Sequence, residues 1–195
     1  NPITMPIGST QQFTATAYDQ FNSQISGVGF TWTSSIGAVD QTGLFTVGTS
    51  VVLGTVTATN GSASGFAIIS VVAGAPHHLY VIPDPANVMV GGSRQFSAIA
   101  FDEFNNAISG ALYTWTTDMG TVDSTGLFTA GFIAGTGTVT ATCGSVSYSA
   151  TVNVLAGALD HVIVLPGSVT LPVGGTQQFT ATGYDVNNNI ITGLS

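Results

Sequence analysis

The carboxylates and amides that could do chemistry in this sequence recur at a constant spacing. Asp19, Asp102 and Asp185 lie 83 residues apart, and each precedes an asparagine by three residues. A calcium ion would need roughly six to eight oxygen ligands, which one Asp and one Asn do not supply. Both side chains instead stabilise turns by hydrogen bonding to nearby backbone groups. We therefore expect three equivalent turns at these positions.

Two further carboxylates lie near the predicted junctions between repeats. Asp84 and Asp160 could combine there with backbone carbonyl oxygens, which are also ligands for calcium. Calcium at a junction therefore remains an alternative. No other metal and no cofactor is expected.

The histidines do not form a recognisable catalytic group. Hydrolysis requires a nucleophile, a base and a group that orients the base, and no such motif accompanies His77, His78 or His161. We expect His78 and His161 to pack at the junctions, each followed by a core residue, Leu79 or Val162. The sequence therefore predicts no catalytic residue and no enzyme.

Composition argues against several classes of partner. The 195 residues include one basic residue, Arg94, and nine acidic ones, for a net charge of -8. Nucleic-acid binding and docking on anionic membranes both need clustered Lys and Arg. No apolar run reaches the roughly 18 residues that span a bilayer, so we expect no membrane insertion of this segment.

The surface is expected to carry unusually little charge. Only 5% of the residues are charged, whereas the surface of a small soluble domain typically has about 25–35% charged residues. Either neighbouring subunits or sugar cover much of the surface, or hydroxyl groups suffice on an extracellular protein. We favour coverage.

Two single residues are candidates for covalent modification. Asn60 begins the N-glycosylation sequon Asn60-Gly61-Ser62 in a predicted strand-end turn, although such short motifs also arise by chance. Cys143 occupies the equivalent position one repeat later. It is the only cysteine, so a free thiol and an interchain disulfide are the alternatives.

The elements that hold these residues belong to a repeat of 83 residues. The same spacing separates Phe13, Phe96 and Phe179, and it separates Trp32 from Trp115. This period is longer than that of a solenoid and suits a small domain with its own core. The predicted domains are residues 1–73, with an incomplete first strand, the complete repeat 74–156, and 157–195, the N-terminal part of a third.

Apolar residues of the complete repeat alternate with period two between Gly, Pro, Asn and Asp turns. The alternation directs Phe96 and its equivalents Phe13 and Phe179 into a core, with Trp115 also pointing inward. Short strands without helical periodicity predict an all-β, two-sheet antiparallel sandwich. The expected strands cover residues 77–82, 87–90, 94–102, 112–117, 121–123, 126–129, 137–142 and 146–155.

Several motifs resemble the bacterial Ig-like domains of group 2, the invasin/intimin-like type. They are residues 169–185 (VTLPVGGTQQFTATGYD), 31–35, 122–130 and 138–142. The resemblance implies tandem Ig-like domains of prokaryotic adhesins, stalks, surface layers or filaments, located outside the cell and without a common catalytic site. Trp32 and Trp115 match the family's core tryptophan, but no disulfide accompanies them.

Outward positions that are apolar in one copy but polar in another are candidates for contacts with a partner. Isolated exposed apolar residues are common, however, and a local bulge could invert the phase of the last strand. The interface candidates are Phe66, Ile68, Phe104, Phe132 and Ile133.

The partial third repeat allows two interpretations. The chain could be a window on a longer array, or residues 160–166 could complete a fold in trans by strand donation. We favour the window, because the third repeat carries the missing strand and also duplicates the two strands that follow it, which strand donation would not need.

The predicted function is structural. We expect a segment of an extracellular surface protein or filament whose tandem domains act as rigid spacers and self-associate with neighbouring copies. The alternatives are an adhesin segment that binds a host protein, a glycan or another cell, and an accessory region of a carbohydrate-active enzyme.

Overall fold

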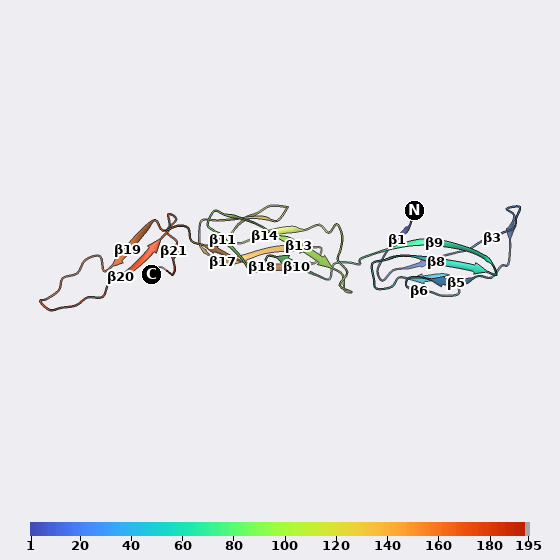
Figure 1. The fold of residues 1–195 in the computed structure, drawn as a ribbon, viewed down its shortest axis with the longest axis horizontal. Helices are drawn as coiled ribbons and strands as arrows, with labels where there is room; N and C mark the ends of the chain where they lie inside the picture. The colour runs from blue at the N-terminus through green and yellow to red at the C-terminus, as the bar shows by residue number, and fades with distance from the viewer. Residues whose placement is uncertain (194–195) are drawn as a thin grey trace. The chain divides into compact units, whose positions relative to one another are not determined.

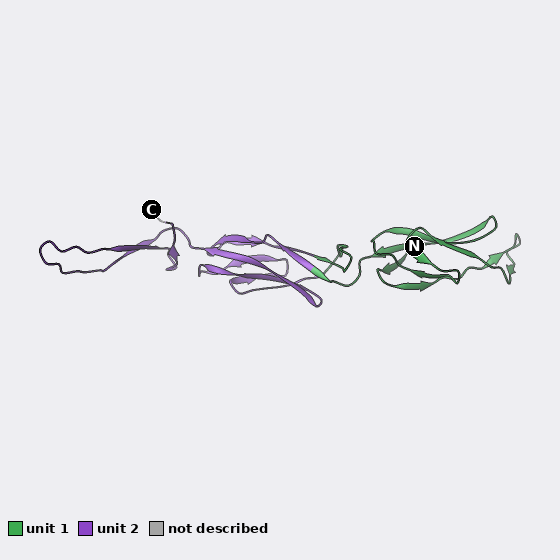
Figure 2. Cartoon of the chain, turned by 90° about the horizontal axis from the view of Figure 1, so that it is seen from below, with its two compact units in different colours: residues 1–78, 100–111 green, residues 79–99, 112–195 purple. Residues whose placement is uncertain are grey.

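The computed structural model describes residues 1–193, and their regular structure consists of β-strands (Figure 1). None of these residues forms a helix that could cross a membrane. The chain divides into two compact units (Figure 2). Unit 1 contains residues 1–78 and 100–111, and unit 2 contains residues 79–99 and the described residues from 112 onward.

Unit 1 is built from two sheets that enclose a core. One sheet has the order β1-β9-β8-β5 (Ile3–Pro6, Ala63–Val72, Leu53–Asn60, Thr31–Ser34). The other has the order β2-β7-β6 (Thr10–Gln12, Leu44–Thr46, Ala38–Val39), and β3 (Ala17–Tyr18) pairs with β4 (Gln24–Ile25). Phe45 of the second sheet packs in one cluster with Val56 and Ile69 of the first. The two sheets therefore form a sandwich.

Unit 2 repeats this plan with longer strands. Its main sheet has the order β11-β18-β17-β14 (Ala86–Met89, Val146–Leu155, Gly135–Cys143, Thr114–Thr117). A second sheet has the order β12-β16-β15 (Ser93–Gln95, Leu127–Ala130, Gly120–Val122). Phe96 and Phe128 meet edge to face between them, with ring centroids 6.1 Å apart, and both are fully buried. The predicted core position of Phe96 is confirmed.

The remaining described strands form two smaller sheets. Strand β10 (His78–Ile82) pairs with β13 (Ser97–Phe101). The last sheet has the order β19-β20-β21 (His161–Leu165, Thr180–Tyr184, Ile190–Ile191).

One strand pair in each sandwich departs from the predicted antiparallel pattern. β1 runs parallel to β9, and β11 runs parallel to β18. In unit 2 the change of partner follows the Pro83-Asp84-Pro85 interruption, since proline cannot donate to a ladder. The chain pairs with β13 before the prolines and with β18 after them, so it changes sheets. The alternation of side chains predicted the faces of these strands but not their partners.

The core predictions fail in the third repeat. Phe179 is 45% exposed and Val162 is 51% exposed, although their equivalents Phe96 and Leu79 are buried. Among the described residues, the sheet β19-β20-β21 has no second sheet paired across its face. Burial of an alternating strand requires a covering layer, and the described residues from 157 onward form only one sheet.

Gly126→Ala should lower the free energy of unfolding of unit 2 more than Gly144→Ala. Both glycines have positive φ, so each substitution carries a backbone penalty of about 1–2 kcal/mol. A Cβ at Gly126 would also lie 2.6 Å from the Phe96 carbonyl oxygen, whereas a Cβ at Gly144 has nothing within 4 Å. We expect this crowding to add about 1–3 kcal/mol, measured by urea unfolding. Equal losses would contradict the packing.

Candidate functional site

The three predicted Asp turns are present. Asp102 Oδ1 accepts hydrogen bonds from the backbone N–H groups of Phe104 and Asn106, both at 2.9 Å. The intervening Asn105 has a φ of 63°, in the left-handed region that asparagine tolerates. Asn22 and Asn188 have nearly the same φ, 63° and 62°. This part of the sequence prediction is confirmed.

In unit 1 the turn at residues 102–106 also holds two distant segments. The Gly74 N–H donates to Asp102 Oδ2 at 3.0 Å, and Asn106 Nδ2 donates to the Thr49 carbonyl at 2.9 Å. The Val51 N–H completes the set with a longer bond of 3.5 Å to Asn106 Oδ1. We call this arrangement of Asp102, Asn106, Gly74 and residues 49–51 the first joint.

Unit 2 contains the same arrangement around Asp185. The Gly157 N–H donates to Asp185 Oδ2 at 2.8 Å. Asn189 Nδ2 donates to the Phe132 carbonyl at 2.9 Å, and Asn189 Oδ1 accepts from the Ala134 N–H at 2.8 Å. We call these residues the second joint. Gly74 and Gly157 both belong to short segments, 73–76 and 156–159, that link one predicted repeat to the next.

The Asp19 turn lacks the features of a joint. Its carboxylate accepts from the N–H groups of Phe21 and Ser23, but Asp19 is exposed and position 23 is serine. Position 23 carries serine where the two joints carry Asn106 and Asn189, and this difference is visible in the sequence.

The joint carboxylates are buried but remain ionised. Burial of Asp185 acts to raise its pKa, but hydrogen bonds from Asn189, Gly157 and Asn187 outweigh this effect and lower the pKa from 3.8 to about 2. The pKa of Asp102 is lowered in the same way: burial is outweighed by bonds from Gly74, Asn106 and Phe104. Amide donors therefore stabilise these charges.

Two of the histidines lie beside the joints and stack on aromatic rings. His78 lies parallel to Phe101 with centroids 5.3 Å apart, and His161 lies parallel to Tyr184 at the same distance. Each ring thus packs on an aromatic neighbour, while a position at a junction between domains stays a prediction.

The calcium alternative gains no support from the side chains. No group of three His, Cys, Asp or Glu residues that could hold a metal occurs in residues 1–193. The Asp84 carboxylate accepts hydrogen bonds from Tyr148 Oη at 2.8 Å and from the Thr151 N–H at 2.9 Å. Asp160 Oδ2 lies 3.0 Å from His161 Nδ1. Both carboxylates thus have partners within the chain.

The five interface candidates are exposed but do not form one surface. Phe66 and Ile68 lie on the outer side of β9, 70% and 41% exposed, in an unbroken register from Leu53↔Ser70 to Asn60↔Ala63. The alternative of a phase-inverting bulge is therefore wrong. Phe104 lies in the turn of the first joint, and Phe132 and Ile133 lie in the loop of the second. Contact of any of the five with a partner stays a prediction.

The two modification candidates differ in accessibility. Asn60 is exposed, and its Nδ2 donates to the Gly29 carbonyl at 2.8 Å. Glycosylation of Asn60 stays a prediction. Cys143 is free and buried, so an interchain disulfide would require local opening of β17.

Comparison with known proteins shows an Ig-like fold. No family model and no curated protein matches the sequence. The structure resembles FdeC, an Escherichia coli adhesin, at 21% identity over 99% of this chain and 73% of that one, with a TM-score of 0.59. It resembles InvD of Yersinia pseudotuberculosis at 20% identity over 90% and 65%, with a TM-score of 0.51.

Surface layer protein SbsC is a third similar structure, at 20% identity and a TM-score of 0.41. This chain spans 26% of the length of the SbsC chain with domains 1–6 and 32% of the one with domains 4–9. Together, FdeC and InvD show that the all-β architecture is that of Ig-like domains, as the sequence predicted.

Asn106→Ala should lower the free energy of unfolding of unit 1 by about 1–3 kcal/mol, because it removes the bonds to Thr49 and Val51 and part of the support for Asp102. Ser23→Ala is the matched control. It alters the equivalent turn position, which lacks such bonds, and should cost less than about 0.5 kcal/mol. Chemical denaturation compares the two. Similar losses would contradict the role of the joint.

The stability that the second joint contributes should fall on acidification. Folding lowers the pKa of Asp185 from 3.8 to about 2, so the contribution is complete above 3.8 and is lost as the pH falls through about 2. Asn189→Ala removes hydrogen bonds to the carboxylate, so its pKa should move toward 3.8. Carbon-detected NMR titration of the Asp185 carboxyl measures both values. Identical titration curves would refute this account of the shift.

Proposed function

We propose that this chain is a non-catalytic structural segment of an extracellular prokaryotic surface protein or filament. Its Ig-like modules act as rigid spacers and as assembly modules. The observation that carries this proposal is the occurrence of two equivalent joints. In each, a buried carboxylate and an asparagine bind both a linker amide and a loop.

A spacer must resist bending at its linkers, and in this proposal the joints supply that resistance. Linker segments of about four residues already leave little freedom. The Gly74 and Gly157 amides are then fixed on buried carboxylates, so rotation of a linker would break a charge-assisted hydrogen bond. In each joint, Nδ2 and Oδ1 of the asparagine also bind backbone groups of a loop. The loop is therefore a second point of attachment.

The assignment to group 2 of the bacterial Ig-like domains supports a surface location. It rests on the motifs quoted from the sequence and on the shared fold of FdeC, which is an adhesin, and InvD. The low charge also fits a protein whose surface is largely covered in an assembly, because desolvating uncharged hydroxyl groups costs less than desolvating charges.

Assembly through lateral contacts would use the outer face of β9. Phe66 and Ile68 are two apolar side chains on one face and the same strand, and both are exposed. The second copy of the repeat has Ser149 and Thr151 at the equivalent positions. We propose that this patch contacts a neighbouring copy.

An adhesin segment is the alternative function, favoured by the similarity to FdeC. In that case the patch of Phe66 and Ile68 would contact a host protein, a glycan or another cell. Monomeric chains that bind to such a partner would support the alternative.

Replacing Phe66 with Ser and Ile68 with Thr gives β9 the residues of the second copy and should preserve folding. Loss of two exposed apolar side chains from a contact should weaken self-association about tenfold or more, measured by sedimentation equilibrium. Leu112→Ser is the control, since Leu112 is 87% exposed and lies outside the patch. Unchanged association of the double variant would remove the lateral-contact proposal.

A further inference from the structure

The loop and the turn of the second joint carry three exposed apolar side chains. Phe132 and Ile133 of the loop are 67% and 77% exposed, and Val186 of the turn is 74% exposed. Asn189, in the same turn as Val186, binds the loop backbone on both sides of Ile133. We call Phe132, Ile133 and Val186 the joint patch.

The exposure of the joint patch is a property of its positions in the repeat. At the first joint, where the repeat that follows is complete, the equivalents are Thr49, Ser50 and Glu103, and all three are exposed. A complete repeat therefore leaves these positions uncovered. Large apolar side chains gathered at such positions indicate contact with a partner.

The loop of the joint patch is fixed by the rest of unit 2. The Gly131 N–H donates to the Met119 carbonyl at 2.9 Å, and the Gly131 carbonyl accepts from the Gly91 N–H at 3.1 Å. A Cβ at Gly91 would lie 3.4 Å from the Phe132 ring, so one side of this ring lies against the Gly91 backbone. Together with the bonds from Asn189, these contacts order the loop before a partner binds, which lowers the entropic cost of binding.

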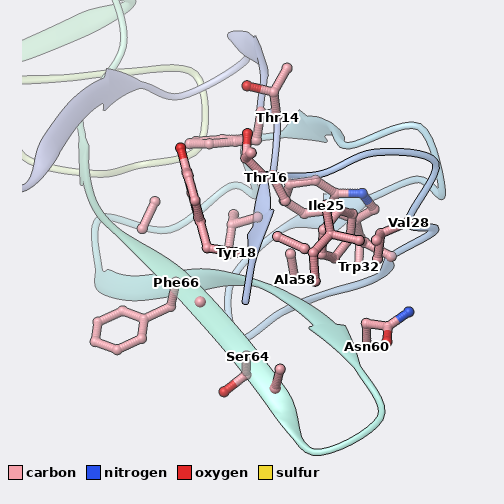
Figure 3. A pocket seen from close by; sticks show the side chains of 18 residues that line it. Thr14, Thr16, Tyr18, Ile25, Val28, Trp32, Ala58, Asn60, Ser64 and Phe66 are labelled. Atoms are coloured by element: carbon pink, nitrogen blue, oxygen red, sulfur yellow. The ribbon is translucent and has the colours of Figure 1, made fainter. Parts of the chain in front are cut away.

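The patch of Phe66 and Ile68, here called the β9 patch, also owes its exposure to its positions. Figure 3 shows the Phe66 ring pointing away from Trp32. In the complete repeat the equivalent Ser149 is exposed and Thr151 is half-buried. The β9 patch therefore lies on an outer sheet face that the complete repeat leaves accessible.

Both patches lie in segments without charge. No Asp, Glu, Lys or Arg occurs in β8, in β9, in the loop 131–134 or in residues 186–189. The chain as a whole has a net charge of -8, so contacts between other surfaces of two copies meet like-charge repulsion. The first joint also has exposed valines, Val51 and Val52, but contact there would desolvate the carboxylate of Glu103. The second joint is therefore the better surface for a second copy.

We propose that the joint patch of one copy packs on the β9 patch of a second copy. Phe132 and Ile133 of the ordered loop contact Phe66 and Ile68 on the sheet face. In register beside these two residues lie threonines of β8, whose methyl groups extend the apolar surface. The contact desolvates no charged group, and burial of apolar side chains drives it.

Pairing of unlike patches covers both of them at once, whereas contact between two β9 patches would leave every joint patch exposed. The β9 patch belongs to unit 1 and the joint patch to unit 2. A copy that binds one neighbour through its joint patch can therefore bind another through its β9 patch. Such heterologous contacts extend into open chains or close into rings.

This inference deepens the assembly role in the proposed function and rests on it, because it names the surface that the β9 patch contacts. The test uses two variants of the full chain. Phe66→Ser with Ile68→Thr removes the β9 patch. Phe132→Thr with Ile133→Ser gives the loop of the second joint the residues of the first, so folding should be preserved. Leu112→Ser is the control, and sedimentation equilibrium over a range of concentrations measures association.

Each double variant alone should associate about tenfold or more weakly than the unmodified chain, because each lacks one side of the contact. An equal mixture of the two should form 1:1 heterodimers as strongly as the unmodified chain associates, since each variant supplies the patch that the other lacks. The control should associate like the unmodified chain.

The outcomes separate this pairing from the lateral contact itself. If only the β9 variant loses association, the pairing is overturned and the lateral-contact proposal stands. Unchanged association of the β9 variant, or no association of the unmodified chain, would overturn both. A mixture that stays monomeric would overturn the pairing even if each variant alone is weakened.

Discussion

The buried carboxylate at each joint is the interaction that ties a linker, a turn and a loop together. Asp102 and Asp185 are almost fully buried, yet neither is paired with a cation. In a chain with a single basic residue, ion pairs cannot be the general way to join modules. At each joint, backbone amides and one asparagine side chain donate hydrogen bonds to the carboxylate. A protein with few charged residues can therefore still hold its linkers by hydrogen bonds to buried carboxylates.

The sandwich of unit 2 also uses one segment of the chain for two pairings. One stretch of chain serves two sheets, because the Pro83-Asp84-Pro85 interruption lets β10 pair with β13 and β11 with β18. Asp84 within this interruption accepts hydrogen bonds from Tyr148 and Thr151 of β18. The first strand is thus anchored on both sides of the break.

The sequence predicts local features of this structure better than long-range ones. The final strand was expected at residues 146–155, where β18 lies, because strict alternation between turn residues specifies both its ends and its faces. The Asp turns follow from local hydrogen bonding in the same way. The bonds from Gly74 to Asp102 and from Gly157 to Asp185 could not be predicted, since they join residues 28 apart through tertiary packing. The exposure of Phe179 and Val162 likewise depends on whether a second layer covers them.

Amide hydrogen exchange at Gly74 and Gly157 in the unmodified chain at neutral pH tests the central claim most directly. Each glycine lies in a short linker, where an unrestrained amide would exchange at nearly the rate of an unstructured peptide. If the carboxylate joints hold the linkers, both amides should exchange at least a hundredfold more slowly than that, in line with about 2.7 kcal/mol or more of protection. Exchange of both at the unstructured rate would contradict the account.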